Sequence, residues 1–416
     1  MLIAVTGMSP QVITETLYGI NRRGDAWPNE IKVITTSKGR DKIWTALNDE
    51  GHLAGLCEML GRPPLTLSQD DILVVPNAQG QEVEDARSVE DHEALADFII
   101  NTVRRFTANP NISIHASIAG GRKTMTFYLG YAMSLFGRHF DQLSHVLVSE
   151  PYENRSDFFY PTRESKILTP KHEQDTPPDA KNAIVTLADI PFVRQRSQLP
   201  KLVMQDLGER ISYRELMNLI NLADTPERIR VQLYPRSRRM VVHDDADKIT
   251  VEMTFPNALV TSFYTLLAEA SQEGNCSFYR TDRDEVTQAM AESLLTKVHE
   301  VLEVKPPRGT NAEALAQNLL QDEYMGLLQR VKIIERSLTP FAKGRGLDGD
   351  TFSNYCTPIR RMLEERLPSD LVQWLEPKQV YDGNEGNRLK NPGSAKNGAY
   401  GIPLPNPEQQ IQIIYE

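Results

Sequence analysis

The sequence predicts an α/β protein whose N-terminal part is a doubly wound parallel sheet. Three observations indicate this fold. Short runs rich in Ile and Val alternate with helical stretches over residues 1–150. Each run is apolar enough to be a strand buried on both faces. Two Gly-containing loops each connect a strand to a helix. Because 416 residues exceed one typical domain, we expect at least one further domain to follow. The order of its elements predicts an α+β, winged helix-turn-helix-like half.

The N-terminal strands and helices are expected to alternate in order along the chain. Such alternation gives a parallel sheet with right-handed crossovers, and ligands of these sheets bind beyond the carboxyl ends of the strands. The expected strands are 2–6, 31–35, 72–75, 112–118 and 145–149, and the expected helices are 12–22, 40–60, 91–106 and 124–136.

A polar, Pro-containing stretch predicts a linker at 166–183, between a first domain of residues 1–165 and a second of residues 184–416. The second part ends in a basic helix, 351–367, capped by Thr351 or Ser353, and a Gly-rich hairpin. This order is typical of a winged helix-turn-helix, with 378–396 as the wing. Before it we expect helices at 213–223, 256–270 and 312–338, strands at 229–234, 240–243 and 249–253, and a polar helical insertion at 271–311. Short strands are expected near 374–375, 400–402 and 411–415.

Composition narrows the class of protein. The net charge of -10 argues against indiscriminate nucleic-acid binding, although a local basic face remains compatible with it. Three widely spaced cysteines fit a reducing cytosol and offer no disulfide framework or zinc spacing. The N-terminus does not look like a signal peptide, and no apolar stretch is long enough to span a bilayer. We expect a cytoplasmic protein without a membrane partner, a metal or a cofactor.

The strongest signal for a ligand is a run that leads from an apolar strand into an apolar helix. Its Gly-Gly turn frees backbone N–H groups, and two cations and a hydroxyl follow at the helix start. The helix dipole disfavours cations there, and an anionic ligand would explain Arg122 and Lys123. The run lacks the first Gly of a P-loop, which disfavours an NTPase. The residues expected to hold phosphate are Ala119, Gly120, Gly121, Arg122 and Thr124.

A second loop, residues 7–11, lies between the first strand and the first helix. Considered alone, Ser9 before a helix fits an N-cap. Because the carboxyl ends of parallel strands meet at one edge of a sheet, we expect this loop to lie close to Arg122 and Lys123, where Ser9 becomes a ligand contact. The other candidate ligand-binding residues here are Gly7, Met8, Gln11 and Thr14.

The C-terminal half carries a separate set of candidate nucleic-acid contacts. Three arginines of the expected recognition helix either contact double-stranded DNA or form a solvated face paired with Glu364 and Glu365. Basic residues in the Gly-rich end, among them Arg388, Lys390 and Lys396, favour nucleic acid, since a basic wing suits phosphate contacts. The candidate residues are Arg360, Arg361, Arg366 and Lys378.

The two loops and their flanks resemble the hallmark segments of a known family. Residues 5–17 (VTGMSPQVITETL) and 115–125 (HASIAGGRKTM) are similar to those of CRISPR-associated Rossmann-fold (CARF) proteins, which include the standalone ring nucleases of type III CRISPR systems. Residues 85–91 resemble the family's intervening acidic segment, and residues 188–194 resemble a segment that follows the sensor in longer members. The resemblance covers about residues 1–165. The C-terminal half resembles a winged-helix extension.

The resemblance implies a homodimer that binds cyclic oligoadenylate, most often cyclic tetra-adenylate, across its two-fold axis. It also implies slow, metal-independent cleavage in which a ribose 2′-hydroxyl attacks the neighbouring phosphodiester. Lys123 would stabilise the transition state and Ser9 would position the ribose or phosphate. Two alternatives stay open: a ligand-controlled DNA-binding regulator without turnover, and a C-terminal half that is a ligand-activated ribonuclease or a protein-docking platform.

Overall fold

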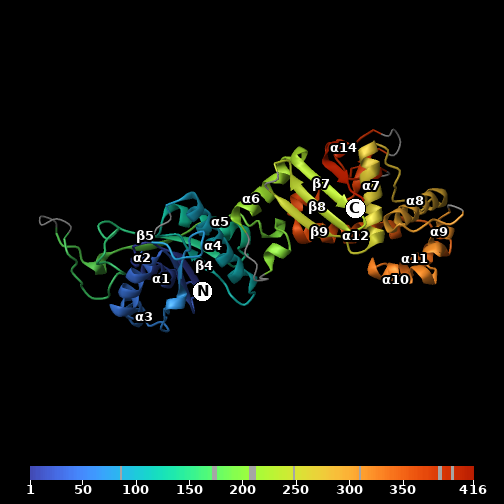
Figure 1. The fold of residues 1–416 in the computed structure, drawn as a ribbon. Coiled ribbons are helices and arrows are strands. Elements are labelled where there is room, and N and C mark those ends of the chain that lie inside the picture. The colour runs from blue at the N-terminus through green and yellow to red at the C-terminus, as the bar shows by residue number, and fades with distance from the viewer. Residues whose placement is uncertain are drawn as a thin grey trace. The chain divides into compact units, whose positions relative to one another are not determined.

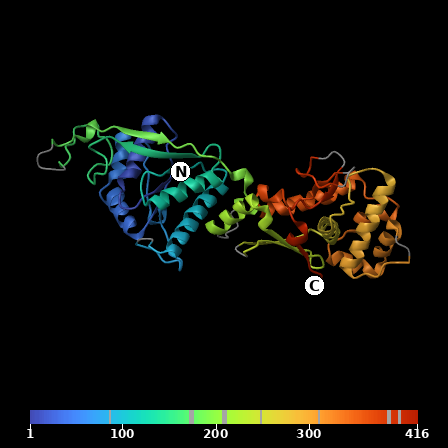
Figure 2. The same ribbon diagram turned by 90° about the horizontal axis from the view of Figure 1, so that it is seen from above.

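The chain folds into two compact units, each with its own hydrophobic core (Figure 1, Figure 2). The first unit comprises Met1–Leu199 with Met204–Arg214, and the second comprises Pro200–Val203 with Glu215–Glu416. The structure, a computed structural model, describes residues 1–84, 87–170, 176–205, 212–246, 249–308, 311–382, 387–394 and 398–416.

A six-stranded sheet in the order β3-β2-β1-β4-β5-β6 forms the centre of the first unit. The first five strands are parallel, and β6 runs antiparallel to β5 along one edge. The α/β class is therefore confirmed, whereas a purely parallel sheet was wrong. The strands are β1 (Leu2–Val5), β2 (Ile31–Thr35), β3 (Ile72–Val74), β4 (His115–Ser117), β5 (Gln142–Val148) and β6 (Val185–Asp189).

Helices cover both faces of this sheet. Leu187 of β6 lies against Gly19 of α1, whereas Leu143 of β5 lies against Gly130 of α5. Leu187 shares a face with Ser144, and Ser144 points away from its neighbour Leu143, because successive residues of a strand face opposite sides. The helices are α1 (Gln11–Arg23), α2 (Ser37–Trp44), α3 (His52–Leu60), α4 (Val89–Ala108) and α5 (Lys123–Phe136).

The expected linker at 166–183 belongs to the first unit. Leu168 and Ala180 are buried in a cluster with Val146 and Val185 of the sheet, and Ile167 forms a β-bridge with Asp179. Residues 171–175 lie outside the described part of the chain. A boundary at 165 or 184 was therefore wrong, because β6 completes the sheet and the first unit continues to Leu199.

The second unit contains a four-stranded sheet in the order β12-β7-β8-β9. Strands β7, β8 and β9 form an antiparallel meander, as the sequence predicted. The C-terminal strand β12 pairs in parallel with β7. It is therefore not part of the terminal hairpin that the sequence had suggested. A separate antiparallel pair is formed by β10 and β11. The strands are β7 (Ile229–Tyr234), β8 (Arg239–Asp244), β9 (Thr250–Thr254), β10 (Lys378–Tyr381), β11 (Ala399–Gly401) and β12 (Ile411–Ile413).

Two helix expectations in this half were wrong. The single helix expected at 312–338 is three helices, because each short segment turns a different leucine, Leu319, Leu328 or Leu338, into the core. The basic helix begins at Gly349, and its N-cap is Asp348, whose carboxylate accepts a hydrogen bond from the Thr351 N–H at 2.9 Å. The helices are α6 (Tyr213–Asn221), α7 (Ala258–Glu273), α8 (Asp284–Leu302), α9 (Ala312–Leu319), α10 (Asp322–Arg330), α11 (Glu335–Ala342), α12 (Gly349–Arg366), α13 (Ser369–Val372) and α14 (Pro407–Gln410).

Candidate functional site

The two ligand-loop candidates lie against each other at the carboxyl ends of β1 and β4. A Cβ placed on Gly120 would lie 3.0 Å from the Thr6 Oγ1 atom and 3.2 Å from the Val5 carbonyl oxygen. Gly121 has φ +90°, a left-handed conformation that favours glycine, and a Cβ on Gly7 would lie 3.8 Å from the Gly121 Cα atom. The glycines therefore permit this close contact, and the two loops form one surface.

Two helix N-termini open onto this surface without a side-chain cap. Pro10 is the N-cap of α1 and Arg122 is the N-cap of α5, and neither makes a side-chain capping bond. By contrast, the Thr36 side chain caps α2. Ser9 is exposed and precedes the N-cap, and the Thr6 hydroxyl donates to the Ser9 carbonyl oxygen at 2.8 Å. Uncapped first-turn N–H groups and the positive ends of both helix dipoles favour an anion here.

The side chains at the start of α5 add to the positive field. Arg122 and Lys123 are both exposed, and no carboxylate among the described residues pairs with Lys123. The Thr124 hydroxyl oxygen is buried without a hydrogen-bond partner among them. A buried hydroxyl without a partner destabilises the fold by about 1–3 kcal/mol, and a ligand phosphate would remove this cost.

Thr14 is the one candidate that the structure withdraws from the surface. It is fully buried, and its hydroxyl lies 2.9 Å from the Gln11 carbonyl oxygen and 2.8 Å from the Phe159 carbonyl oxygen. A ligand role for Thr14 was therefore wrong, because helix periodicity turns this position inward. Gln11 is half-buried, and its amide donates to the Ser156 carbonyl oxygen at 3.1 Å. Met8 is exposed, and Ala119 is half-buried beside the Gly-Gly turn.

The sequence-based prediction missed a third loop at this edge, which follows β2. A Cβ on Gly39 would lie 2.5 Å from the Gly7 carbonyl oxygen and 2.0 Å from the Thr35 Oγ1 atom. The first turn of α2 therefore packs directly against the Gly7–Ser9 loop. The only sequence signal is the glycine itself, three residues after the Thr36 cap.

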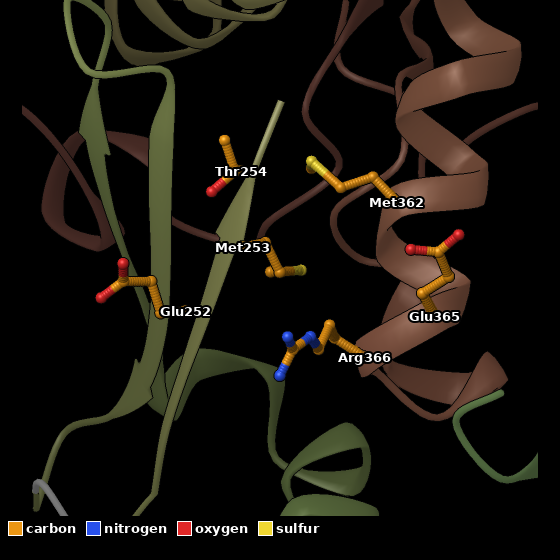
Figure 3. Close-up of a pocket in the computed structure, with 6 residues that line it drawn as sticks. All are labelled: Glu252, Met253, Thr254, Met362, Glu365 and Arg366. Atoms are coloured by element: carbon orange, nitrogen blue, oxygen red, sulfur yellow. The ribbon is translucent and has the colours of Figure 1, made fainter. Parts of the chain in front are cut away.

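The four candidate nucleic-acid residues differ in their ion pairs and surroundings. The Arg360 Nε atom lies 2.8 Å from Glu364 Oε1, and the Lys378 Nζ atom lies 3.0 Å from Glu376 Oε1. Arg366 lines a groove of about 440 Å³ between α12 and β9, together with Met253 and Met362 (Figure 3). The ion pair between Arg360 and Glu364 is the one expected if this side of α12 is a solvated face. Arg361 is exposed, and Lys396 lies outside the described residues.

Two negative findings hold for the described residues. None of their helices combines the length and the apolar character needed to cross a membrane. No group of three or more His, Cys, Asp or Glu side chains among them is arranged to hold a metal ion.

Comparison with known proteins assigns the chain to a family. No curated protein matches the sequence. The family model of the CRISPR-associated protein NE0113 matches residues 9–225, which is more than half of the chain. The match begins in the loop after β1 and ends beyond α6, so it includes Ser9, the Gly-Gly turn and Lys123. The protein therefore belongs to the NE0113 family of CRISPR-associated proteins.

Proposed function

We propose that this protein is a type III CRISPR accessory protein that binds cyclic oligoadenylate, cyclic tetra-adenylate in the first instance, and cleaves it slowly without a metal. One observation carries the proposal: two uncapped helix N-termini, a Gly-Gly turn and two exposed cations converge at the carboxyl edge of a sheet. This arrangement suits several phosphates held close together.

In this proposal the first unit is a CARF sensor with a Rossmann-like sheet, and two copies form a homodimer in the cytoplasm. A two-fold dimer presents the same loops twice, and a ring of four adenylates contains matching pairs of phosphates. Each protomer would hold one half of the ring with the Gly120 and Gly121 amides, Arg122 and Thr124. Met8 and Gln11 would border the ribose.

The chemistry needs only alignment and charge stabilisation. A ribose 2′-hydroxyl attacks the adjacent phosphorus, the bond to the 5′-oxygen breaks, and a 2′,3′-cyclic phosphate and a 5′-hydroxyl result. Lys123 would stabilise the negative charge of the phosphorane, and Ser9 would orient the ribose. Among the described residues we assign no histidine or carboxylate as a general base at this surface, so we propose slow turnover.

Occupancy of this surface would also control the second unit, a winged-helix-like effector half in this proposal. Helix α5 starts at Lys123. The aromatic side chains of its Tyr128 and Tyr131 contact that of Tyr213, with centroid distances of 5.3 and 5.8 Å. Tyr213 begins α6, the helix in which the chain passes into the second unit. A ligand that shifts α5 would therefore act on the start of α6.

The test is incubation of the pure protein in EDTA with cyclic tri-, tetra- and hexa-adenylate, followed by chromatography of the products. We expect linear products from one ring. Lys123→Ala should slow cleavage by roughly 10²–10³-fold, the usual effect of losing one charge-stabilising group. Lys42→Ala, which alters an exposed lysine in the last turn of α2, should cleave at the wild-type rate.

The other outcomes separate the alternatives. Wild-type cleavage by Lys123→Ala would refute the catalytic assignment. Tight ring binding without products, together with ligand-dependent binding of duplex DNA, would indicate a DNA-binding regulator. Cleavage of RNA only in the presence of a ring would indicate an effector ribonuclease.

A further inference from the structure

A polar pocket of about 310 Å³ lies in the second unit between α12, β10 and β11. Four of its residues, at positions 353, 356, 357 and 360, follow the i, i+3, i+4, i+7 pattern and so share one side of α12. The volume is at the lower end of the range of small-molecule pockets, about 300–1,000 Å³. The charged and hydroxyl-bearing side chains that line it are Arg280, Ser353, Thr357, Arg360, Glu376, Lys378 and Tyr400.

The pocket carries an excess of positive charge. Three cations, Arg280, Arg360 and Lys378, line it with one carboxylate, Glu376. The Glu376 carboxylate is shared, with Oε1 at 3.0 Å from Lys378 Nζ and Oε2 at 3.6 Å from Arg360 Nε. Burial raises the pKa of the Cys356 thiol to about 12, so this thiol adds no negative charge at neutral pH.

Several donors in the pocket have no acceptor among the described residues. Both carboxylate contacts of Arg360, to Glu364 and Glu376, are made by Nε, so its two terminal amino groups remain available. The Arg280 guanidinium has no ion pair within the described part of the chain. It is close enough to the pocket wall that its charge partly offsets the rise in pKa that burial causes at Tyr400. A planar guanidinium fork matches the oxygens of a phosphate.

The same pocket contains a fixed aromatic ring. Tyr400 is half-buried, and its ring packs edge-on against Phe352 at a centroid distance of 4.7 Å. Cations bind phosphate, and an aromatic face stacks a base of any identity. We propose that this pocket binds a nucleoside monophosphate, with the phosphate at Arg280, Arg360 and Lys378 and the base at Tyr400. This site is separate from the ring-binding surface of the first unit and does not depend on its activity.

The test is titration calorimetry of the full chain at low salt with AMP, adenosine and inorganic phosphate. AMP should bind more tightly than either component, and added salt should weaken it. Arg280→Ala should weaken AMP binding by at least about tenfold, since a charged hydrogen bond is lost. The matched control is Arg283→Ala, an exposed arginine at the start of α8 that does not line the pocket, and it should bind AMP as the wild type does.

Two further variants test the base contact and the location of the bound AMP. Tyr400→Leu should reduce the preference for AMP over inorganic phosphate, and Lys123→Ala should leave AMP binding unchanged. Binding that Lys123→Ala abolishes and Arg280→Ala preserves would overturn the proposal in favour of the first unit. It would also be overturned if AMP does not bind, or if duplex DNA alone binds through Arg280.

Discussion

Glu15 is a buried carboxyl group in the first turns of α1, with 8% of its surface exposed. Burial, with a smaller effect of the nearby Glu153 carboxylate, raises its pKa from 4.5 to about 7. The group lies one residue after Thr14, whose hydroxyl holds the Phe159 carbonyl. Glu15 thus lies in the buried part of α1, the helix whose N-terminus forms part of the candidate site. We expect its charge state to affect the stability of this part of the first unit.

The raised pKa predicts a pH-dependent stability. Because the folded state binds the Glu15 proton more tightly, the contribution of Glu15 to the free energy of unfolding is greatest below pH 4.5 and is lost as the pH rises through about 7. Glu15→Gln cannot ionise and should be more stable than the wild type at pH 8 by roughly 3 kcal/mol, at about 1.4 kcal/mol per pKa unit. Denaturant unfolding at pH 5 and pH 8 measures this difference.

The control is Glu58→Gln, which removes an exposed carboxylate on α3. Its stability relative to the wild type should hardly change between the two pH values, since surface substitutions usually have small effects. If Glu15→Gln behaves in the same way, the Glu15 carboxyl is ionised in the folded protein at neutral pH and the raised pKa is wrong.

The loop after β2 shows how one element supports another at the site. Gly39→Ala would place a Cβ 2.0 Å from the Thr35 hydroxyl oxygen and 2.5 Å from the Gly7 carbonyl oxygen. The backbone must move to relieve this contact, so we expect a loss of about 1–3 kcal/mol in unfolding free energy. Ring binding should weaken as well, because the Gly7–Ser9 loop is displaced. Thermal unfolding and ring titration measure the two effects.

A second glycine supplies the matched control for this substitution. Gly326 lies within α10, and no atom is within 4 Å of the position that a Cβ would occupy. Gly326→Ala should therefore stabilise the protein by about 0.5–1 kcal/mol through the higher helix propensity of alanine. A Gly39→Ala protein that is as stable as Gly326→Ala would contradict the close approach of α2 and the Gly7–Ser9 loop.

The elements that the sequence predicted well are those with a local cause. The strands β2 and β7 occupy their expected residues because continuous or alternating apolar patterns define them. The Gly-Gly turn was found because two glycines followed by two cations and a hydroxyl at a helix start form a local pattern that suits phosphate. By contrast, β6 is a short, half-buried edge strand, and only its pairing with β5 shows where it belongs.

Properties that depend on distant partners could not be predicted. Thr14 was expected to contact a ligand, but its hydroxyl donates to the carbonyl oxygen of Phe159, a residue far along the chain. The contact of Arg360 with Glu376, which lies on the other side of the pocket, likewise left no signal in the sequence. Sequence spacing reveals an ion pair within one helix, such as Arg360 with Glu364, but not one between elements.

At the scale of the whole molecule, the family match ends shortly after the chain has entered the second unit. The match ends at residue 225, and the chain enters the second unit between Arg214 and Glu215, inside α6. The family match therefore covers the first unit from Ser9 onward and the whole of α6. The role of most of the second unit depends on its own residues, such as those of the pocket that contains Arg280.

The first residues of α6, the helix in which the chain passes into the second unit, are held by contacts with two helices of the first unit. The Tyr213 N–H donates to Asp97 of α4 at 2.7 Å, and Arg214 forms an ion pair with Glu93 of the same helix. The Tyr213 ring contacts Tyr128 and Tyr131 of α5, and burial raises the pKa of its hydroxyl to about 12. Both helices that hold Tyr213 belong to the first unit, and one of them begins at the candidate ligand surface.

We therefore expect Tyr213→Ala to separate ligand binding from its effect on residues 215–416. The variant keeps every residue of the two loops, so ring binding and cleavage should match the wild type. Hydrogen exchange should show that cyclic oligoadenylate protects the second unit in the wild type. The variant should show little of this protection, because the aromatic contacts with α5 are lost. Tyr324→Ala, which alters a tyrosine of α10 outside this cluster, should respond as the wild type does. If Tyr213→Ala keeps the full response, the signal does not pass through this aromatic cluster.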